Sequence, residues 1–388
     1  MVTIEEALKI VQQQGVALQT VHKPLLDAMG YALVDEVKAP FDMPAFDNSA
    51  MDGYALCGIF QEYNIVGEVA AGDTNSIALK AGEAVRIFTG ARVPESASAV
   101  MMQEKTKVEG NILLLEELPK MGQNIRKKGG ELKEGQRVFE AGHVLNPRSM
   151  GLLGSLGLEQ VLVFSKPTIN LITTGNELVQ PGQPKSEGQI YESNSFALTG
   201  AMKQFGFECQ QTKQVADDFE ATKRSIGEAL QTCDVLLLSG GISVGDYDFV
   251  KQALEENGVE ELFYKVFQKP GKPLFFGRKA NQFVFALPGN PASSLTCFYI
   301  YVLPMLQKLS GYSELGLPSY HFPMKHPYES RFDRPSFLKA GIVDGLVEIL
   351  DGQGSSMIQS MALGNALAFV EAGGKRAAGD LVECKLIS

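Results

Sequence analysis

Cysteine and histidine are scarce in this sequence of 388 residues, which contains five cysteines and four histidines. The cysteines lie far apart and form no CxxC pair: Cys57, Cys209, Cys233, Cys297 and Cys384. The histidines are equally scattered: His22, His143, His321 and His326. This spacing argues against a zinc site and against a disulfide framework.

The sequence also lacks a long apolar run and a positive net charge. The longest apolar run, around Leu295 to Leu306, is broken by Pro304 and is too short to cross a bilayer, so we expect no membrane span. The formal net charge of -10 argues against nucleic acid as the main partner, because a phosphate backbone needs a basic face. A small anionic ligand is still compatible with this net charge, because such a ligand responds to the local charge at its site more than to the net charge. The N-terminus shows no basic region followed by an apolar stretch, so we expect no signal peptide and a cytoplasmic location.

Changes in the sequence pattern predict a multidomain protein of the α/β plus β class. Residues 3–6 form a capping box that predicts a first helix, which ends near Gly15. Short apolar runs punctuated by glycine predict small β domains with tight turns. The expected domains are a helical linking domain (1–45 with 140–165), a β-rich domain (46–139), an α/β domain (166–311) and a C-terminal β domain (312–388).

Strand-like and helix-like segments alternate within the expected α/β domain. Residues 168–173, 234–238 and 283–287 are apolar runs that predict buried strands, and residues 194–205 and 218–230 predict helices between them. Strand, crossover helix and strand are typical of a doubly wound parallel sheet. Ligands bind at the carboxyl ends of the strands in such sheets, so we expect the functional residues there.

A glycine-rich loop follows the second of these strands and reads LSGGISVGDYD over residues 238–248. Glycines let the backbone approach an anionic group, and the start of the following helix adds partial positive charge. The loop is not a Walker A motif, because no Gly-Lys-Ser/Thr follows. A plain strand-to-helix turn is the alternative interpretation. Asp248 favours a binding role, because a carboxylate beside an anion loop suggests a bridging Mg²⁺.

Two further segments of the α/β domain carry candidate binding residues. In LPGNPASS, residues 287–294, Asn290 is able to cap a helix that starts at Pro291, while the two prolines and the glycine predict a stiff loop that shapes a pocket. Lys265, Lys269 and Lys272 fall within eight residues, separated by apolar residues and prolines. These lysines predict charge neutralisation at phosphates, and a solvated charge run is the alternative.

Carboxylates near the other strand ends are further candidate functional residues. Glu177 directly follows the first strand, and no capping role accounts for it. Asp217 and Asp218 precede a helix, where a capping role is the alternative to a functional one. In the expected β-rich domain, the polar segment 46–55 contains Asp52, with a turn as the alternative interpretation.

Eight segments together resemble the molybdopterin molybdenumtransferase family, which includes MoeA and the E domain of gephyrin. They occur in order over nearly the whole chain: DNSAMDGYA, RIFTGARVP, GQNIRKKGGE, TTGNEL, GQIYESN, SGGISVGDYD, KPGKP and LPGNP. The resemblance implies a subunit of four domains and a homodimer in which each active site joins two subunits. It also implies a reaction in which adenylylated molybdopterin and molybdate give molybdenum cofactor and AMP, with Mg²⁺.

The resemblance also implies roles for individual residues. Cofactor-binding roles fall on Ser239, Gly240, Gly241, Ser243, Gly245, Lys265, Lys269, Lys272, Pro288, Asn290 and Pro291. Roles in holding Mg²⁺ or positioning the pyrophosphate fall on Glu177, Asp217 and Asp248. Catalytic roles facing the pocket of the partner fall on Asp52, Thr89, Arg126 and Glu131. Molybdate would meet Lys265, Lys269, Lys339 and Ser355.

Two positions depart from the family pattern. The family commonly has a Glu-Asp pair after the position of Arg126, where this chain has Gly130 and Glu131. It often has arginine at the position of Lys339, and lysine offers a point charge without bidentate geometry.

Two other functions stay open at this point. One is molybdopterin adenylyltransfer, because proteins of that earlier step share the α/β module, although the large flanking domains count against it. The other is a non-enzymatic scaffold, since gephyrin also clusters receptors, although we expect this chain to lack the additional N-terminal domain of gephyrin. A molybdopterin adenylyltransferase is also an expected partner. No residue separates molybdate from tungstate as the substrate.

Overall fold

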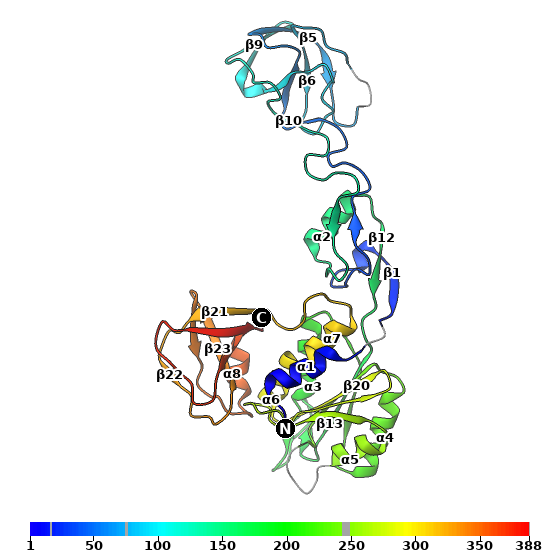
Figure 1. Ribbon diagram of the computed structural model, residues 1–388, viewed down its shortest axis with the longest axis vertical. Coiled ribbons are helices and arrows are strands. Elements are labelled where there is room, and N and C mark those ends of the chain that lie inside the picture. Colours follow the sequence, from blue (N-terminus) through cyan, green and yellow to red (C-terminus); the bar gives the residue numbers. More distant parts are fainter. Residues whose placement is uncertain (16–17, 74–76, 243–248, 388) are drawn as a thin grey trace. The chain divides into compact units, whose positions relative to one another are not determined.

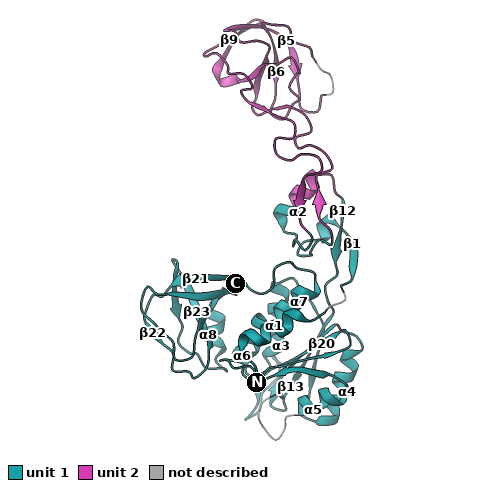
Figure 2. Ribbon diagram, viewed as in Figure 1, with its two compact units in different colours: residues 1–34, 141–150, 159–388 teal, residues 35–140, 151–158 magenta. Residues whose placement is uncertain are grey.

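The computed structural model describes residues 1–15, 18–73, 77–242 and 249–387 (Figure 1). The chain forms two compact units (Figure 2). The larger unit comprises residues 1–34, 141–150 and 159–388, and the smaller one residues 35–140 and 151–158. Within the described ranges, no helix has the length and apolar character that a bilayer crossing requires.

A six-stranded sheet forms the centre of the larger unit. Its order is β16 (Cys209–Val215), β13 (Ile169–Thr174), β17 (Val235–Ser239), β20 (Gln282–Leu287), β19 (Phe275–Lys279) and β18 (Glu260–Tyr264). The first four strands are parallel, whereas β19 and β18 are antiparallel to their neighbours. The expectation of a parallel sheet is therefore wrong for the pairings of β19, which runs opposite to the other five strands. Only Ala280 and Asn281 separate β19 from β20, and so short a connection joins antiparallel strands only.

Helices cover both faces of this sheet. Alternate strand residues such as Leu171 and Leu237 pack in one core with α1 (Ile4–Gln13), α3 (Asn194–Gln204), α6 (Pro291–Cys297) and α7 (Leu303–Leu309). Ile172 and Leu238 point the other way and pack with α4 (Phe219–Leu230) and α5 (Phe249–Glu256). The strands are thus buried on both sides, which explains why they read as continuous apolar runs.

The first helix and the apolar run 295–306 behave as their sequences indicate. The Thr3 hydroxyl accepts from the Glu6 backbone N–H at 3.2 Å and the Glu6 carboxylate accepts from the Thr3 N–H at 2.8 Å, which confirms the capping box. The apolar run crosses α6, a π-helical turn η3 (Phe298–Val302) and α7, and most of it is buried in the core.

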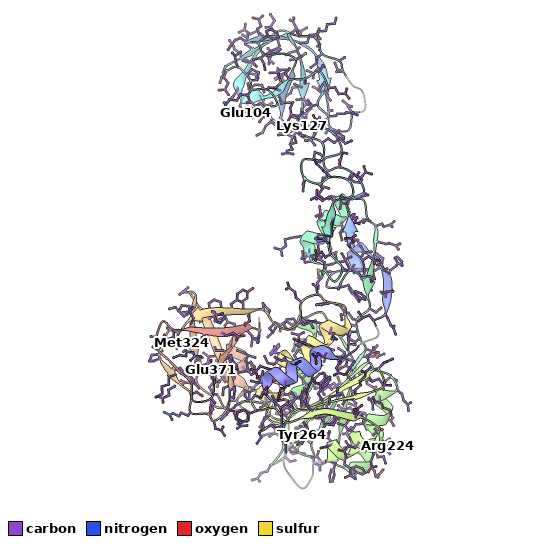
Figure 3. The ribbon with its side chains drawn as sticks, in the orientation of Figure 1. Glu104, Lys127, Arg224, Tyr264, Met324 and Glu371 are labelled. Carbon is purple, nitrogen blue, oxygen red and sulfur yellow. The ribbon has the colours of Figure 1, made fainter. Side chains whose placement is uncertain are left out.

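A second sheet closes the C-terminal part of the larger unit. It is antiparallel, in the order β21 (Ser319–Pro323), β27 (Leu381–Leu386), β25 (Ala366–Val370), β23 (Ser336–Val343) and β24 (Leu346–Ile349). Its buried side chains, Met324 among them (Figure 3), form a separate core. The short helix α8 (Ile358–Leu363) contacts β23.

Short elements complete the larger unit. They are β1 (Thr20–Pro24) paired with β12 (Gln160–Phe164), η1 (Leu25–Asp27), β14 (Leu178–Val179) paired with β15 (Ile190–Tyr191), and β22 (Tyr328–Glu329) paired with β26 (Lys375–Arg376). The helix α2 (Pro147–Ser155) lies where the chain passes between the two units.

The smaller unit is built on a six-stranded sheet. The order is β7 (Ala99–Met102), β4 (Gly53–Leu56), β6 (Glu83–Ile87), β5 (Glu62–Val69), β9 (Ile112–Leu115) and β8 (Thr106–Glu109), with η2 (Gln103–Lys105) after β7. Two small pairs accompany it: β2 (Val37–Lys38) with β11 (Arg137–Phe139), and β3 (Asn48–Ser49) with β10 (Ile125–Arg126). Gly53 is needed here, because a Cβ atom would lie 1.9 Å from the carbonyl oxygen of Met101.

Candidate functional site

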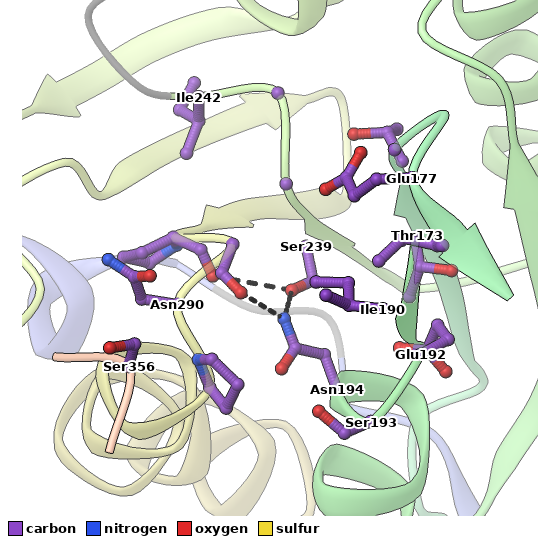
Figure 4. A pocket seen from close by; sticks show the side chains of 18 of the residues that line it. Thr173, Glu177, Ile190, Glu192, Ser193, Asn194, Ser239, Ile242, Asn290 and Ser356 are labelled. Atoms are coloured by element: carbon purple, nitrogen blue, oxygen red, sulfur yellow. Dashed lines mark hydrogen bonds between the residues drawn. The ribbon is translucent and has the colours of Figure 1, made fainter. Parts of the chain in front are cut away.

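The carboxyl ends of β13, β17 and β20 border a cavity of about 570 Å³ (Figure 4). Parallel strands end at the same edge of a sheet, so the loops that follow them meet there. The volume falls in the range of small-molecule sites. Eight of the residues predicted from the sequence line this cavity: Glu177, Asp217, Ser239, Gly240, Gly241, Pro288, Asn290 and Pro291.

The glycine loop after β17 forms one wall, in a conformation that requires glycine. Gly240 has φ +100° and Gly241 has φ +62°. A Cβ atom on Gly240 would lie 2.5 Å from the carbonyl oxygen of Thr174, and one on Gly241 would lie 2.6 Å from a methyl carbon of Val250. Their backbone therefore lies close against β13 and α5. The predicted residues Ser243, Gly245 and Asp248 lie outside the described residues.

Asn194 joins two of the strand ends. Its amide nitrogen donates to the Ser239 hydroxyl at 2.8 Å and to the Gly289 carbonyl at 2.7 Å (Figure 4). The sequence predicts Asn194 only as the start of a helix and misses this role. The GQIYESN segment that contains Asn194 was the one available signal. Other polar cavity residues missed in the same way are Thr173, Thr174, Tyr191, Glu192 and Ser193.

Replacing Asn194 with alanine should therefore loosen the cavity without unfolding the sheet. Two hydrogen bonds that connect the ends of β17 and β20 are lost, at about 1 kcal/mol each. We expect ligand affinity to fall about tenfold, which corresponds to about 1.4 kcal/mol. Calorimetric titration with molybdopterin, the ligand that the resemblance implies, measures this effect. Thr199→Ala, on the same helix, is the control, and equal affinities of wild type and Asn194→Ala would contradict the prediction.

Glu177 and Asp217 line the acidic side of the cavity. The backbone N–H of Asp217 donates to the Asn176 side-chain oxygen at 3.0 Å, and the Asn176 N–H donates to the Asp217 carboxylate at 3.3 Å. This reciprocal pair ties the loop after β13 to the loop after β16. In the part of the chain that the structure describes, no three His, Cys, Asp or Glu side chains gather as a metal site. The neighbouring Asp218 caps α4, since its carboxylate accepts from the Ala221 N–H at 2.8 Å.

The C-terminal part of the larger unit contributes the wall opposite the glycine loop. Ser356 lines the cavity, and Asn290 donates from its amide nitrogen to the Ser355 hydroxyl at 3.0 Å. Asn290 does stand immediately before α6, with Pro291 at the start of that helix. Its side chain makes no capping hydrogen bond, so the capping interpretation is wrong for the side chain.

The four predicted lysines are not among the described residues that line the cavity. The Lys269 ammonium lies 3.5 Å from the centre of the Phe332 ring, and the Lys265 ammonium 4.6 Å from that of Tyr264. Burial, and then the charge of Arg334, hold the pKa of Lys269 below its usual value. Lys272 is exposed, and Lys339 is buried in the C-terminal sheet.

The remaining predicted residues, Asp52, Thr89, Arg126 and Glu131, lie on the smaller unit, and all four are exposed. The Asp52 carboxylate accepts from the Thr89 backbone N–H at 2.7 Å and from the Thr89 hydroxyl at 2.8 Å. These bonds favour the charged form and hold the pKa of the Asp52 carboxyl below its usual value. Asp52 and Thr89 thus form a fixed polar pair with a permanent negative charge near neutral pH. Arg126 lies on β10, opposite Asn48.

Comparisons with known proteins give matches along most of the chain. Three family models match: the MoeA N-terminal region (domains I and II) at residues 2–157, a probable molybdopterin-binding domain at residues 170–308, and the MoeA C-terminal region (domain IV) at residues 322–387. The cavity and its glycine loop fall within the second of these segments.

Similar proteins cover most of the chain. A molybdopterin molybdenumtransferase of Haemophilus influenzae is 37% identical over 83% of this chain and 81% of its own length. One from Nostoc is 34% identical over 89% of this chain and 84% of its own length. The crystal structure of a molybdopterin biosynthesis MoeA protein of Pyrococcus horikoshii matches with a TM-score of 0.85 at 28% identity and covers 100% of both chains. The resemblance seen in the sequence is thereby confirmed: the chain belongs to the molybdopterin molybdenumtransferase (MoeA) family and is a transferase of molybdenum cofactor biosynthesis.

Proposed function

We propose that the cavity at the ends of β13, β17 and β20 binds adenylylated molybdopterin, and that the protein inserts molybdenum from molybdate into the dithiolene of this ligand and releases AMP. The observation that carries this proposal is the glycine loop, whose backbone approaches within contact distance of β13 on one side of a cavity of about 570 Å³. Such a loop at strand ends suits phosphate groups, because backbone N–H groups donate hydrogen bonds to anions. Helices on both faces of the sheet support the doubly wound form of this domain, with β18 and β19 as an antiparallel extension.

Glu177 and Asp217 are proposed to hold Mg²⁺ beside the phosphates, together with Asp248 outside the described residues. Mg²⁺ prefers oxygen ligands and is commonly bound by one or two carboxylates plus substrate phosphates and water, so this donor set fits the ion. When bound, the ion would neutralise charge on the phosphates. The residues themselves bind and orient: Asn194 keeps Ser239 and Gly289 in place, and Asn290 joins the cavity to Ser355.

Lys265, Lys269 and Ser355 are proposed to attract molybdate toward the cavity. Molybdate is a dianion, and Lys269 and Arg334 place two positive charges at the junction with the C-terminal sheet, offset in part by the Asp333 carboxylate 3.2 Å from Arg334. The Lys269 backbone N–H donates to the Pro335 carbonyl there at 2.9 Å. The proposed reaction therefore relies on charge neutralisation and positioning and does not need a strong nucleophile.

AMP release from adenylylated molybdopterin, with and without molybdate, tests the proposed function in the presence of Mg²⁺. Release that molybdate stimulates, accompanied by active cofactor, is the expected result. Tight pterin binding without any release would contradict the proposal. Transfer of AMP from ATP to molybdopterin would instead show the adenylyltransferase.

A homodimer is also proposed, in which Asp52, Thr89, Arg126 and Glu131 of one subunit serve the cavity of the other. Their exposure on a separate compact unit supports this role. Mixing an Asp52→Ala subunit with an Asp217→Asn subunit then restores one intact site in each mixed dimer. With half of the dimers mixed, activity should recover to about a quarter of wild type. Each variant assayed alone is the control, and no recovery after subunit exchange would contradict a shared site.

A further inference from the structure

Lys339 is a buried cation whose hydrogen-bonding capacity is fully used. It lies on β23, with 2% of its surface exposed. Its ammonium group donates to the carbonyl oxygens of Gly352 at 2.6 Å, Gly354 at 2.9 Å and Met357 at 3.0 Å. An ammonium group has three N–H donors, so these three bonds occupy all of them. The charge of Lys339 therefore acts on the backbone of one loop.

This loop, residues 351–357, is termed the wall loop below. Gln353 fixes it to the same strand, because its side-chain oxygen accepts from the Lys339 backbone N–H at 2.9 Å and its amide nitrogen donates to the Lys339 carbonyl at 2.8 Å. Ser360 adds a bond from its hydroxyl to the Gly352 carbonyl at 2.7 Å. With these contacts, the side chains of Lys339, Gln353 and Ser360 fix the wall loop to β23 and α8.

The wall loop, which these contacts fix to β23, also borders the cavity. Ser356 lines the cavity, and Figure 4 shows it near Asn290. The neighbouring Ser355 accepts the hydrogen bond from Asn290 at 3.0 Å. Lys339 is thus connected to the cavity through the backbone of the wall loop, while its own ammonium is not among the described groups that line it.

We infer that Lys339 is a positioning residue for the proposed reaction, which holds the wall loop against the cavity and does not itself contact molybdate. This inference rests on the proposed function and states how one wall of the proposed binding cavity is kept in place. An oxyanion that bound the ammonium would have to displace at least one carbonyl and leave it without its partner in a buried site. Three carbonyl dipoles favour the charged ammonium, whereas burial lowers the pKa of Lys339.

Lys339→Gln separates positioning from direct contact. If Lys339 positions the wall loop, hydrogen–deuterium exchange should become faster in residues 351–357. The KM for adenylylated molybdopterin should rise about tenfold, as expected when a wall contact of about 1.4 kcal/mol is lost. The kcat should stay within about threefold of wild type, since the reacting groups are unchanged. A rise in the KM for molybdate alone, with unchanged exchange in the wall loop, would overturn the inference.

Lys325→Gln is the matched control, because it removes the same charge from an exposed lysine of the C-terminal sheet that pairs with Glu348 at 2.7 Å. It should behave as wild type in all three readouts. If Lys339→Gln does not fold, Gln353→Ala loosens the same loop and keeps the cation, and it should reproduce the rise in KM for adenylylated molybdopterin. An unchanged KM and unchanged exchange in Gln353→Ala would also overturn the inference. If wild type and Lys325→Gln release no AMP, the proposed function fails, and the exchange comparison alone then decides the role of Lys339.

Discussion

Replacing Gly240 with alanine should destabilise the larger unit by about 3 kcal/mol and abolish ligand binding in the cavity. The residue has φ +100°, a conformation that side chains with a Cβ atom rarely adopt. The new Cβ atom would also lie 2.5 Å from the Thr174 carbonyl oxygen and 2.8 Å from its hydroxyl oxygen. The Thr174 carbonyl belongs to the backbone of the central strand β13, which is held in the sheet, so the glycine loop must move. Chemical denaturation measures the loss of stability, and calorimetric titration with the pterin ligand measures the loss of binding.

Gly200→Ala provides the control for this substitution. Gly200 lies on α3 in the same unit, and a Cβ atom there would meet nothing within 4 Å. Alanine favours a helix by up to about 1 kcal/mol over glycine, so stability should stay equal or rise. Unfolding of Gly240→Ala at the same denaturant concentration as wild type would show that the loop does not have the described conformation.

Asp217→Asn is expected to lower the rate of Mg²⁺-dependent AMP release about a hundredfold or more, because the proposed Mg²⁺ site loses one of its negative charges. The fold should be preserved. The asparagine side-chain oxygen is able to accept the hydrogen bond that the Asn176 N–H donates to Asp217 at 3.3 Å. Glu177→Gln should have the same effect, since both carboxylates line the same side of the cavity. A titration of the rate with Mg²⁺ should show that both variants need more of the ion.

The adjacent Asp218 offers a matched control for the loss of charge. Its carboxylate caps α4 through the Ala221 N–H at 2.8 Å, and it is not among the described residues that line the cavity. Asparagine is also a good capping residue, so Asp218→Asn should change stability by less than about 1 kcal/mol and leave the rate unchanged. The proposed metal site would be contradicted if Asp217→Asn and Asp218→Asn had the same Mg²⁺ dependence.

Much of the central sheet is predictable from the sequence, because its physical cause is local. Strands β13, β17 and β20 are buried on both faces, and each reads as an apolar run of the expected length. Strands β18 and β19 are not predictable in this way. Their sequences, EELFY and FFGRK, mix charged and apolar residues, so neither reads as a buried strand. The segment between them contains lysines and prolines and is interpreted from the sequence as a binding loop.

The residues of the candidate site are likewise only partly predictable from the sequence. The glycine loop, Glu177 and Asn290 directly follow strands, so their meeting at one cavity follows from the parallel order of β13, β17 and β20. Asn194 and Ser356 come to the cavity through tertiary contacts that no local pattern contains. The burial of Lys339 is equally unpredictable from the sequence, because its three carbonyl partners lie 13, 15 and 18 residues further along the chain.

The most direct measurement is an experimental structure of the protein with adenylylated molybdopterin and Mg²⁺ bound. We expect the ligand in the cavity at the ends of β13, β17 and β20, with its phosphates within hydrogen-bonding distance of the backbone N–H of Gly241, since the Gly240 N–H already donates to the Leu287 carbonyl at 3.2 Å. Electron density for the ion should lie between these phosphates and the carboxylates of Glu177 and Asp217. A ligand bound elsewhere on the chain, with the glycine loop in contact only with solvent, would contradict the assignment of this cavity.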